Sequence, residues 1–223
     1  RMLFGGANGV ADVPGDAGVG TRPPNDRRMN DRIIQALVLD NTNRGYSASI
    51  TAQLQKSFSS GFYASAAYTF TDSRDLNSQS GSTAGGLFTG NQIVNSPNAP
   101  TLAWSSNLTP HRIIASASYR VEYLKNFATT ISAVYEGRSG SNFSYVYGSS
   151  PNSDGINNND LIYVPRNRNE IILTTTDARD TRTPEQIWQQ LDAYIAQDRY
   201  LNSRRGEYAQ RNGAIAPWVN SLN

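Results

Sequence analysis

The sequence predicts an all-β fold: a segment of a large antiparallel transmembrane β-barrel with long extracellular loops, one of which carries a short α-helix. Three observations lead to this prediction. Long stretches alternate between apolar and polar residues, very short turns alternate with very long loops, and aromatic residues recur at both ends of the alternating stretches. All three features are typical of strands that cross an outer membrane.

The alternation is clearest in the stretch that contains Tyr46, Ile50 and Leu54 on one face and serines, threonines and glutamines on the other. Period-2 alternation of this length is a strong strand signal. Short turns at 59–61 and 124–126 each join two such stretches, which predicts two β-hairpins. A fifth, weaker strand precedes them. The predicted strands cover about 33–40, 44–58, 62–72, 111–123 and 127–147.

The aromatic residues supply an independent length check. Phe58 and Phe62 flank one short turn, and Tyr123 and Phe127 flank the other. Twelve steps separate Tyr46 from Phe58, which is about 40 Å at about 3.3 Å per residue. At a tilt of about 40° this length spans about 30 Å, close to an apolar band of about 25 Å with its aromatic girdles.

The predicted loops cover about 1–32, 73–110 and 148–213 and are rich in Ser, Gly, Asn and Pro. Structureless connections of this length are uncommon in a compact domain. A soluble, long-stranded antiparallel sheet with one wet face is the alternative, because it shows the same alternation.

Five strands cannot close such a barrel. Closure needs about eight strands, and each unpaired backbone group of an open edge costs several kcal/mol in hydrocarbon. We therefore expect residues 1–223 to be part of a barrel domain, completed by a longer chain or by other chains, with no plug domain in these residues.

Composition argues against several other classes. The absence of cysteine excludes disulfide scaffolds, thiol catalysis and thiolate metal sites. A single histidine, His111, leaves little room for a histidine metal cage, and a net charge of +2 does not indicate nucleic acid as a partner. No apolar run approaches the roughly 18 residues of a membrane-spanning helix. No phosphate-binding loop or catalytic arrangement is evident, so we expect no enzyme.

An Asn- and Asp-rich segment surrounds Gly155 and resembles part of a calcium loop, which needs hard oxygen ligands and a glycine at its sharp turn. Leu161 stands where the closing bidentate glutamate is expected. An Asx-rich turn explains the same residues without a metal. Both interpretations stay open, and calcium is the one cofactor that the sequence raises. The candidate ligands are Asn152, Asp154, Asn158 and Asp160.

The last long loop is predicted to contain a helix at about 184–201. Thr183 is its expected N-cap, Pro184 fits the first helical position, and Gln186 completes a capping box. An apolar stripe along the helix predicts that the helix packs against its own loop. The alternative is that the same stripe binds a partner.

Four segments of the chain resemble one known family. They lie at 43–56, 67–75, 159–165 and 205–220, and the run Asn-Asp-Leu-Ile-Tyr-Val-Pro at 159–165 is the most specific. Together they resemble TonB-dependent outer-membrane transporters of the Oar-like branch. The resemblance implies a barrel of about 22 strands plugged by an N-terminal domain, which takes up a scarce, bulky nutrient with energy from the TonB complex.

From this resemblance we expect a location in the bacterial outer membrane and contacts with membrane lipid, with the rest of the barrel and its plug, and with the TonB complex through an N-terminal part outside these residues. Ligand would meet the long loops and the polar strand face, where the candidate contacts are Arg138, Tyr145 and Tyr147. Two alternatives stay open: a barrel that anchors large loops for adhesion or partner binding, and a soluble secreted β-sheet protein.

Overall fold

The computed structural model describes residues 2–4, 36–79, 81–94, 97–125, 127–152, 156–174 and 179–223. The chain forms two compact units, which we describe separately and call the sheet unit and the loop unit. The sheet unit comprises Thr42–Ser78, Leu102–Phe143 and Ile215–Asn223. The loop unit comprises Arg1–Asn41, Gln79–Thr101 and Ser144–Ala214.

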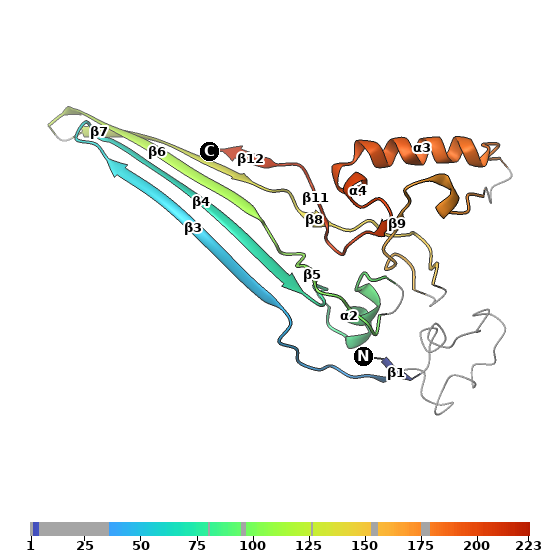
Figure 1. The fold of residues 1–223 in the computed structure, drawn as a ribbon. Coiled ribbons are helices and arrows are strands. Elements are labelled where there is room, and N and C mark those ends of the chain that lie inside the picture. The colour runs from blue at the N-terminus through green and yellow to red at the C-terminus, as the bar shows by residue number, and fades with distance from the viewer. Residues whose placement is uncertain are drawn as a thin grey trace. The chain divides into compact units, whose positions relative to one another are not determined.

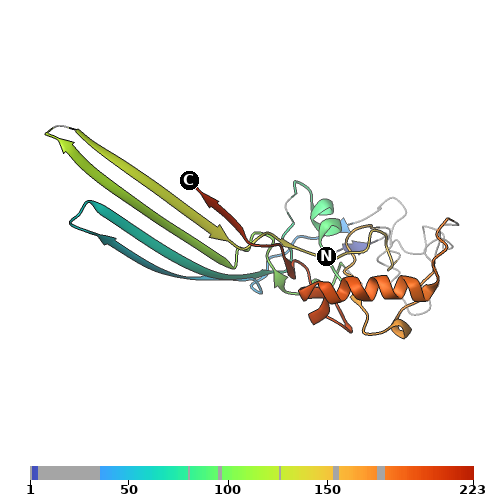
Figure 2. The same cartoon turned by 90° about the horizontal axis from the view of Figure 1, so that it is seen from above.

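The sheet unit is an antiparallel sheet of long strands, which agrees with the all-β prediction. Its strand order is β12-β7-β6-β4-β3, and β5 pairs with the end of β4 (Figure 1). The two long hairpins, β3–β4 and β6–β7, run side by side and share the β4–β6 pairing (Figure 2). The strands are β3 (Tyr46–Ser57), β4 (Phe62–Asp75), β5 (Ala103–Trp104), β6 (His111–Leu124), β7 (Phe127–Arg138) and β12 (Val219–Leu222).

The turn between β3 and β4 is tight, as the sequence predicts. Phe58 N–H donates to the carbonyl of Phe62 at 2.8 Å, and Gly61 adopts φ +79°. A Cβ at Gly61 would lie 2.5 Å from the carbonyl oxygen of Arg120. Glycine is therefore required here for its left-handed backbone and for the close approach of β6.

Two of the predicted strands are wrong in extent. The strand predicted over 127–147 ends at Arg138, and β8 (Asn142–Phe143) is separate from it. The break lies at Gly140, where a Cβ would collide with the carbonyl of Pro217, so the backbone passes closely there and leaves the ladder. The strand predicted at 33–40 shortens to β2 (Ala36–Leu37), which pairs with β1 (Met2–Phe4); residues 33–35 lie outside the described part.

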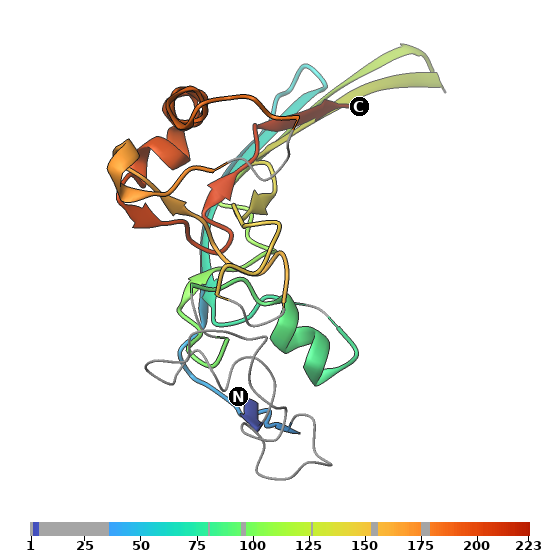
Figure 3. The same cartoon turned by 90° about the vertical axis from the view of Figure 1, so that its right-hand side faces the viewer.

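The loop unit contains short helices around a small apolar core of Val164, Ile195 and Leu201. Helices α3 and α4 lie close together in Figure 3, which looks along α3. β9 and β10 form a two-stranded antiparallel ladder. The elements are α2 (Ala84–Gly90), β9 (Tyr163–Val164), a 3₁₀ turn (Arg168–Glu170), α3 (Pro184–Gln197), α4 (Arg199–Ser203) and β10 (Glu207–Tyr208). β11 (Ala214–Ile215) follows and pairs with β8; the chain divides between the two units within it.

The helix predicted at 184–201 is two helices. The capping box is confirmed, since Thr183 Oγ1 accepts from Gln186 N–H and the Gln186 side chain accepts from Thr183 N–H. The helix ends early because Asp198 is extended, and its carboxylate caps α4 by accepting from Leu201 N–H at 2.8 Å. The side chain of an aspartate can bond to a nearby backbone N–H in place of a helical carbonyl, which favours a break in the helix at that position.

Helix α2 lies inside the loop predicted over 73–110 and is not apparent from the sequence. It contains three glycines in seven residues, which disfavour a helix by up to about 1 kcal/mol each. Thr83 caps it by accepting from Gly86 N–H at 3.2 Å, and Phe88 is buried. Packing and capping therefore outweigh helix propensity here.

Candidate functional site

The largest feature of the sheet unit is an apolar face, which we call the outer face. Register places side chains of the same parity on it: Ile50 opposes Phe70, Tyr119 opposes Ile131, and Tyr119 also opposes Phe62. Leu54 is 81% and Ile131 71% exposed, so no layer of the described chain covers this face. A soluble monomer rarely leaves so large an apolar surface bare.

The aromatic residues of the outer face gather toward its two ends. At the end of the short turns, Phe58 and Phe62 lie 5.5 Å apart between ring centroids. At the opposite end, the His111 ring stacks on Tyr68, and His111 Nδ1 forms a hydrogen bond of 2.7 Å with the Tyr68 hydroxyl. Small and aliphatic residues such as Ala66 and Ala115 lie between them.

The opposite face of the same strands, the inner face, is joined by polar side chains. Thr51 and Thr69 share a hydroxyl hydrogen bond at 2.9 Å, and Ser65 and Ser116 share one at 2.7 Å. These pairs tie β3 to β4 and β4 to β6. One face of the sheet is therefore mainly apolar, and the other is joined by polar side chains.

Arg138, the first predicted ligand contact, lies exposed at the end of β7 on the inner face. It stands opposite Arg112 in the ladder, and Arg112 forms an ion pair with Glu136 at 2.9 Å. Two guanidinium groups and one carboxylate therefore meet at this corner, which leaves it with net positive charge. Such a corner suits an anionic or strongly hydrogen-bonding ligand.

Tyr145 and Tyr147, the other two predicted contacts, lie in the loop unit and hold its core in place. Tyr145 donates to the Asp198 carboxylate at 2.5 Å and stacks on Tyr200, with ring centroids 6.2 Å apart. Tyr147 accepts from Tyr163 N–H at 3.2 Å. The structure thus gives both tyrosines a structural role and places Arg138 in the other unit.

Burial raises the pKa of Tyr145, and its hydrogen bond to Asp198 raises it further. The phenol therefore stays protonated above the pH at which a free tyrosine ionises, and it remains a donor to Asp198. Glu170 shows the opposite shift: the Arg166 N–H and the Tyr163 hydroxyl donate to its carboxylate and lower its pKa.

Three of the four candidate calcium ligands, Asn152, Asn158 and Asp160, lie among the described residues. Asp154 lies outside the described residues. Asn152 Oδ1 accepts from Ser150 at 3.0 Å, and Asn158 adopts φ 63°, a left-handed backbone that Asn tolerates in turns. Within the described part of the chain, no three His, Asp or Glu side chains cluster as metal ligands do.

Asp160 instead belongs to a buried polar junction that the sequence does not reveal. Its backbone and that of Asn159 pair with Ile93 and Tyr147, and Ser144 Oγ bridges Gln92 and the Asn212 N–H at 2.6 and 2.7 Å. This junction joins four stretches of the loop unit, around residues 92–93, 144–147, 159–160 and 212. Its buried polar residues are Asn91, Asn159, Asp160, Arg211 and Asn212.

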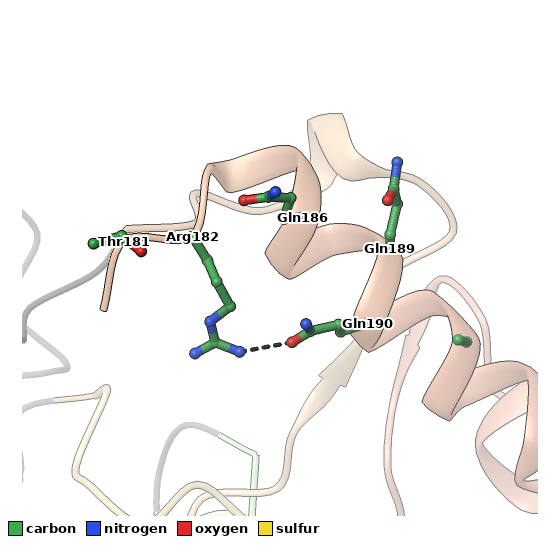
Figure 4. A pocket seen from close by; sticks show the side chains of 6 residues that line it. Thr181, Arg182, Gln186, Gln189 and Gln190 are labelled. Carbon is green, nitrogen blue, oxygen red and sulfur yellow. Dashed lines mark hydrogen bonds between the residues drawn. The ribbon is translucent and has the colours of Figure 1, made fainter. Parts of the chain in front are cut away.

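The loop unit also has a polar cleft of about 510 Å³ beside the first turns of α3 (Figure 4). Arg182 points at Gln190 across it and donates at 2.6 Å. Asp180 pairs with the same guanidinium, which lowers the pKa of Asp180 to about 2. The charges compensate, so the cleft offers mainly amide donors and acceptors. It is lined by Thr181, Arg182, Gln186, Gln189, Gln190 and Ala193.

Comparison of the chain with protein-family models, with curated proteins and with solved structures finds no match. Among the described residues, no helix is long and apolar enough to cross a membrane.

Proposed function

We propose that this chain forms part of the barrel wall of an outer-membrane TonB-dependent transporter that takes up a bulky nutrient. The observation that carries the proposal is the bare outer face of the sheet, apolar over long strands and bounded at both ends by aromatic residues. Lipid is the medium in which such a face is stable without a covering layer.

The two edges of the sheet support the same proposal. In the described part of the chain, β3 and β12 each pair on one side only. Unpaired edges cannot lie in hydrocarbon, because each free N–H or C=O costs several kcal/mol there. Further strands, from residues beyond these or from other chains, would continue the sheet and close it.

The transport part of the proposal rests on the resemblance to TonB-dependent transporters and on the polar inner face. Arg138 and Arg112 lie at the ends of β7 and β6 that lead into the long loops, and they are the proposed ligand contacts on the polar face. Tyr147 lies in one of those loops. The folded loop unit, with its cleft on α3, adds further polar surface on loops of the same chain.

The first experiment asks whether the protein is a barrel in the outer membrane. The full-length protein is expressed in a bacterium, the membranes are separated, and the outer-membrane fraction is run on a gel with and without boiling. Recovery in that fraction with a heat-dependent shift in mobility is the expected result. A detergent-free soluble product without the shift favours the secreted β-sheet alternative and overturns the proposal.

The second experiment asks whether the protein transports. Growth on, or uptake of, candidate bulky nutrients is compared in cells with and without an intact TonB complex. Uptake should require TonB, and Arg138→Gln should weaken it, whereas Ser132→Ala, on the same face but far from the loops, serves as the matched control. Ligand or surface binding that survives the loss of TonB, without any uptake, indicates the adhesion alternative instead.

A further inference from the structure

The outer face of the β3–β4 hairpin contains a shallow groove of about 410 Å³ next to its short turn. Ala64 and Ala66 form its floor, since their small side chains leave space beside the larger Leu54 and Phe58. The groove is mainly apolar, and register places Leu54 opposite Ala66 and Lys56 opposite Ala64 on one face. Gln55 and Ser65, a cross-strand pair of the other parity, complete its lining.

One cation lies at the turn end of this groove. The ammonium of Lys56 is 4.9 Å from the centroid of the Phe58 ring, a cation–π distance. Across the part of the chain that the structure describes, Lys56 has no carboxylate partner. Glu122, near the turn end of β6, pairs with Arg120 at 3.0 Å on the inner face.

Charge is distributed unevenly along the outer face of the hairpin. Asp72 and Arg74 lie at the loop end, where Asp72 accepts from the hydroxyl of Tyr46. Asp72 is eight residues from Ala64 along β4, about 26 Å at about 3.3 Å per residue. The turn end therefore presents an uncompensated positive charge.

The groove thus shows a fixed order, with a cation at the turn end and an apolar floor that runs from it toward the middle of the sheet. An anionic phospholipid has the complementary order, with a phosphate at the surface and an acyl chain below it. Basic side chains at a membrane surface attract such lipids, by about fivefold in affinity per lysine.

We propose that the groove of Leu54, Lys56, Phe58, Ala64 and Ala66 binds one acyl chain of an anionic phospholipid whose phosphate pairs with Lys56. This inference rests on the proposed function, because it requires the hairpin to lie in a bilayer. It adds a defined lipid site at the end of the sheet that carries the short turns.

The test uses the full-length protein, reconstituted in vesicles of equal parts phosphatidylglycerol and phosphatidylcholine. Flotation of the vesicles first reports insertion. Spin-labelled versions of the two lipids, or native mass spectrometry of protein extracted from the vesicles, then report the preference for phosphatidylglycerol in the bound lipid.

Four variants separate the effect of the Lys56 charge on lipid binding from the effect of the groove's shape and from that of lysines in general. Lys56→Gln should lower the preference for phosphatidylglycerol about fivefold, and Lys56→Arg should retain it. Ala66→Leu, which fills the floor and keeps the charge, should reduce the number of tightly bound lipids. Lys125→Gln, at the turn between β6 and β7, removes the only other lysine of residues 1–223 and should lower the preference by less than Lys56→Gln does, because Lys125 does not line the groove.

The outcomes are distinguishable. Wild-type protein that does not float with the vesicles removes the proposed function and the groove proposal together. Wild-type protein that floats but shows no preference for phosphatidylglycerol overturns the groove proposal alone. An unchanged preference in Lys56→Gln, or an equal loss in Lys125→Gln, also overturns it.

Discussion

Ile131→Arg places a charge near the middle of the outer face. Ile131 is 71% exposed and lies on β7 four residues from Phe127 and four from Tyr135, at the two ends of the apolar stretch. Four residues are about 13 Å along the strand, or about 10 Å in depth at a tilt of about 40°. The arginine would therefore sit near the centre of an apolar band of about 25 Å, where a charge costs about 2–4 kcal/mol.

The assay is denaturant unfolding of the full-length protein in vesicles, followed by tryptophan fluorescence. The matched control is Ser132→Arg, which puts the same side chain at the neighbouring residue of the same strand but on the inner face, opposite Ser118. A substitution exposed to water usually changes stability by less than about 0.5 kcal/mol. The two variants should thus differ by about 2–4 kcal/mol.

A lipid-facing outer face is contradicted if both variants lose the same free energy of unfolding, or if Ile131→Arg is as stable as the parent protein. Equal losses would mean that both faces meet the same medium. No loss would mean that the outer face is already in water, because an arginine there would then be tolerated like any surface residue.

Three further predictions follow from single contacts. Gly61→Ala should lower the free energy of unfolding of the sheet unit by more than about 1 kcal/mol in denaturant. The reason is that Gly61 has φ +79° and a Cβ would lie 2.5 Å from the Arg120 carbonyl oxygen; unchanged stability would contradict this turn geometry. Thr183→Ala should weaken the first turn of α3 by about 0.5–2 kcal/mol, seen as faster amide hydrogen exchange confined to that turn. The Asp180 carboxyl should titrate near 2, so its ion pair with Arg182 persists at neutral and mildly acidic pH and is lost only as the pH falls through about 2. In Arg182→Gln, the pKa of Asp180 measured by NMR should return to about 3.9.

The long strands were predictable because their signal is local. Alternation determines which residues share a face, so parity alone correctly places Tyr46, Ile50 and Leu54 on the same face. The ends of the strands were less predictable. Phe143, Tyr145 and Tyr147 continue the parity of β7, yet the chain leaves the ladder after Arg138, because a segment far ahead in the sequence approaches Gly140.

The same limit applies to the candidate site. Asn159 and Asp160 look like turn or metal residues in isolation, but they are buried by pairing with Ile93, more than sixty residues earlier. Asp198, where the predicted helix breaks, also accepts a hydrogen bond from Tyr145, which lies more than fifty residues earlier. Contacts between distant residues leave no local pattern in the sequence. The capping box at Thr183 involves residues three apart, so the sequence predicts it and the structure confirms it.

If the outer face of the sheet meets lipid and the inner face meets water, solvent accessibility should alternate from residue to residue along β7. Residues 1–223 contain no cysteine, so a single cysteine introduced along β7 is the only one in this part of the protein, and any cysteine elsewhere in the full-length protein is first replaced by serine. Spin labels at 129–134 in the full-length protein in vesicles report collisions with oxygen, which concentrates in lipid, and with a water-soluble nickel complex. The account predicts strict alternation: high oxygen accessibility at Thr129, Ile131 and Ala133, and high nickel accessibility at Thr130, Ser132 and Val134. Nickel accessibility at all six positions would contradict it.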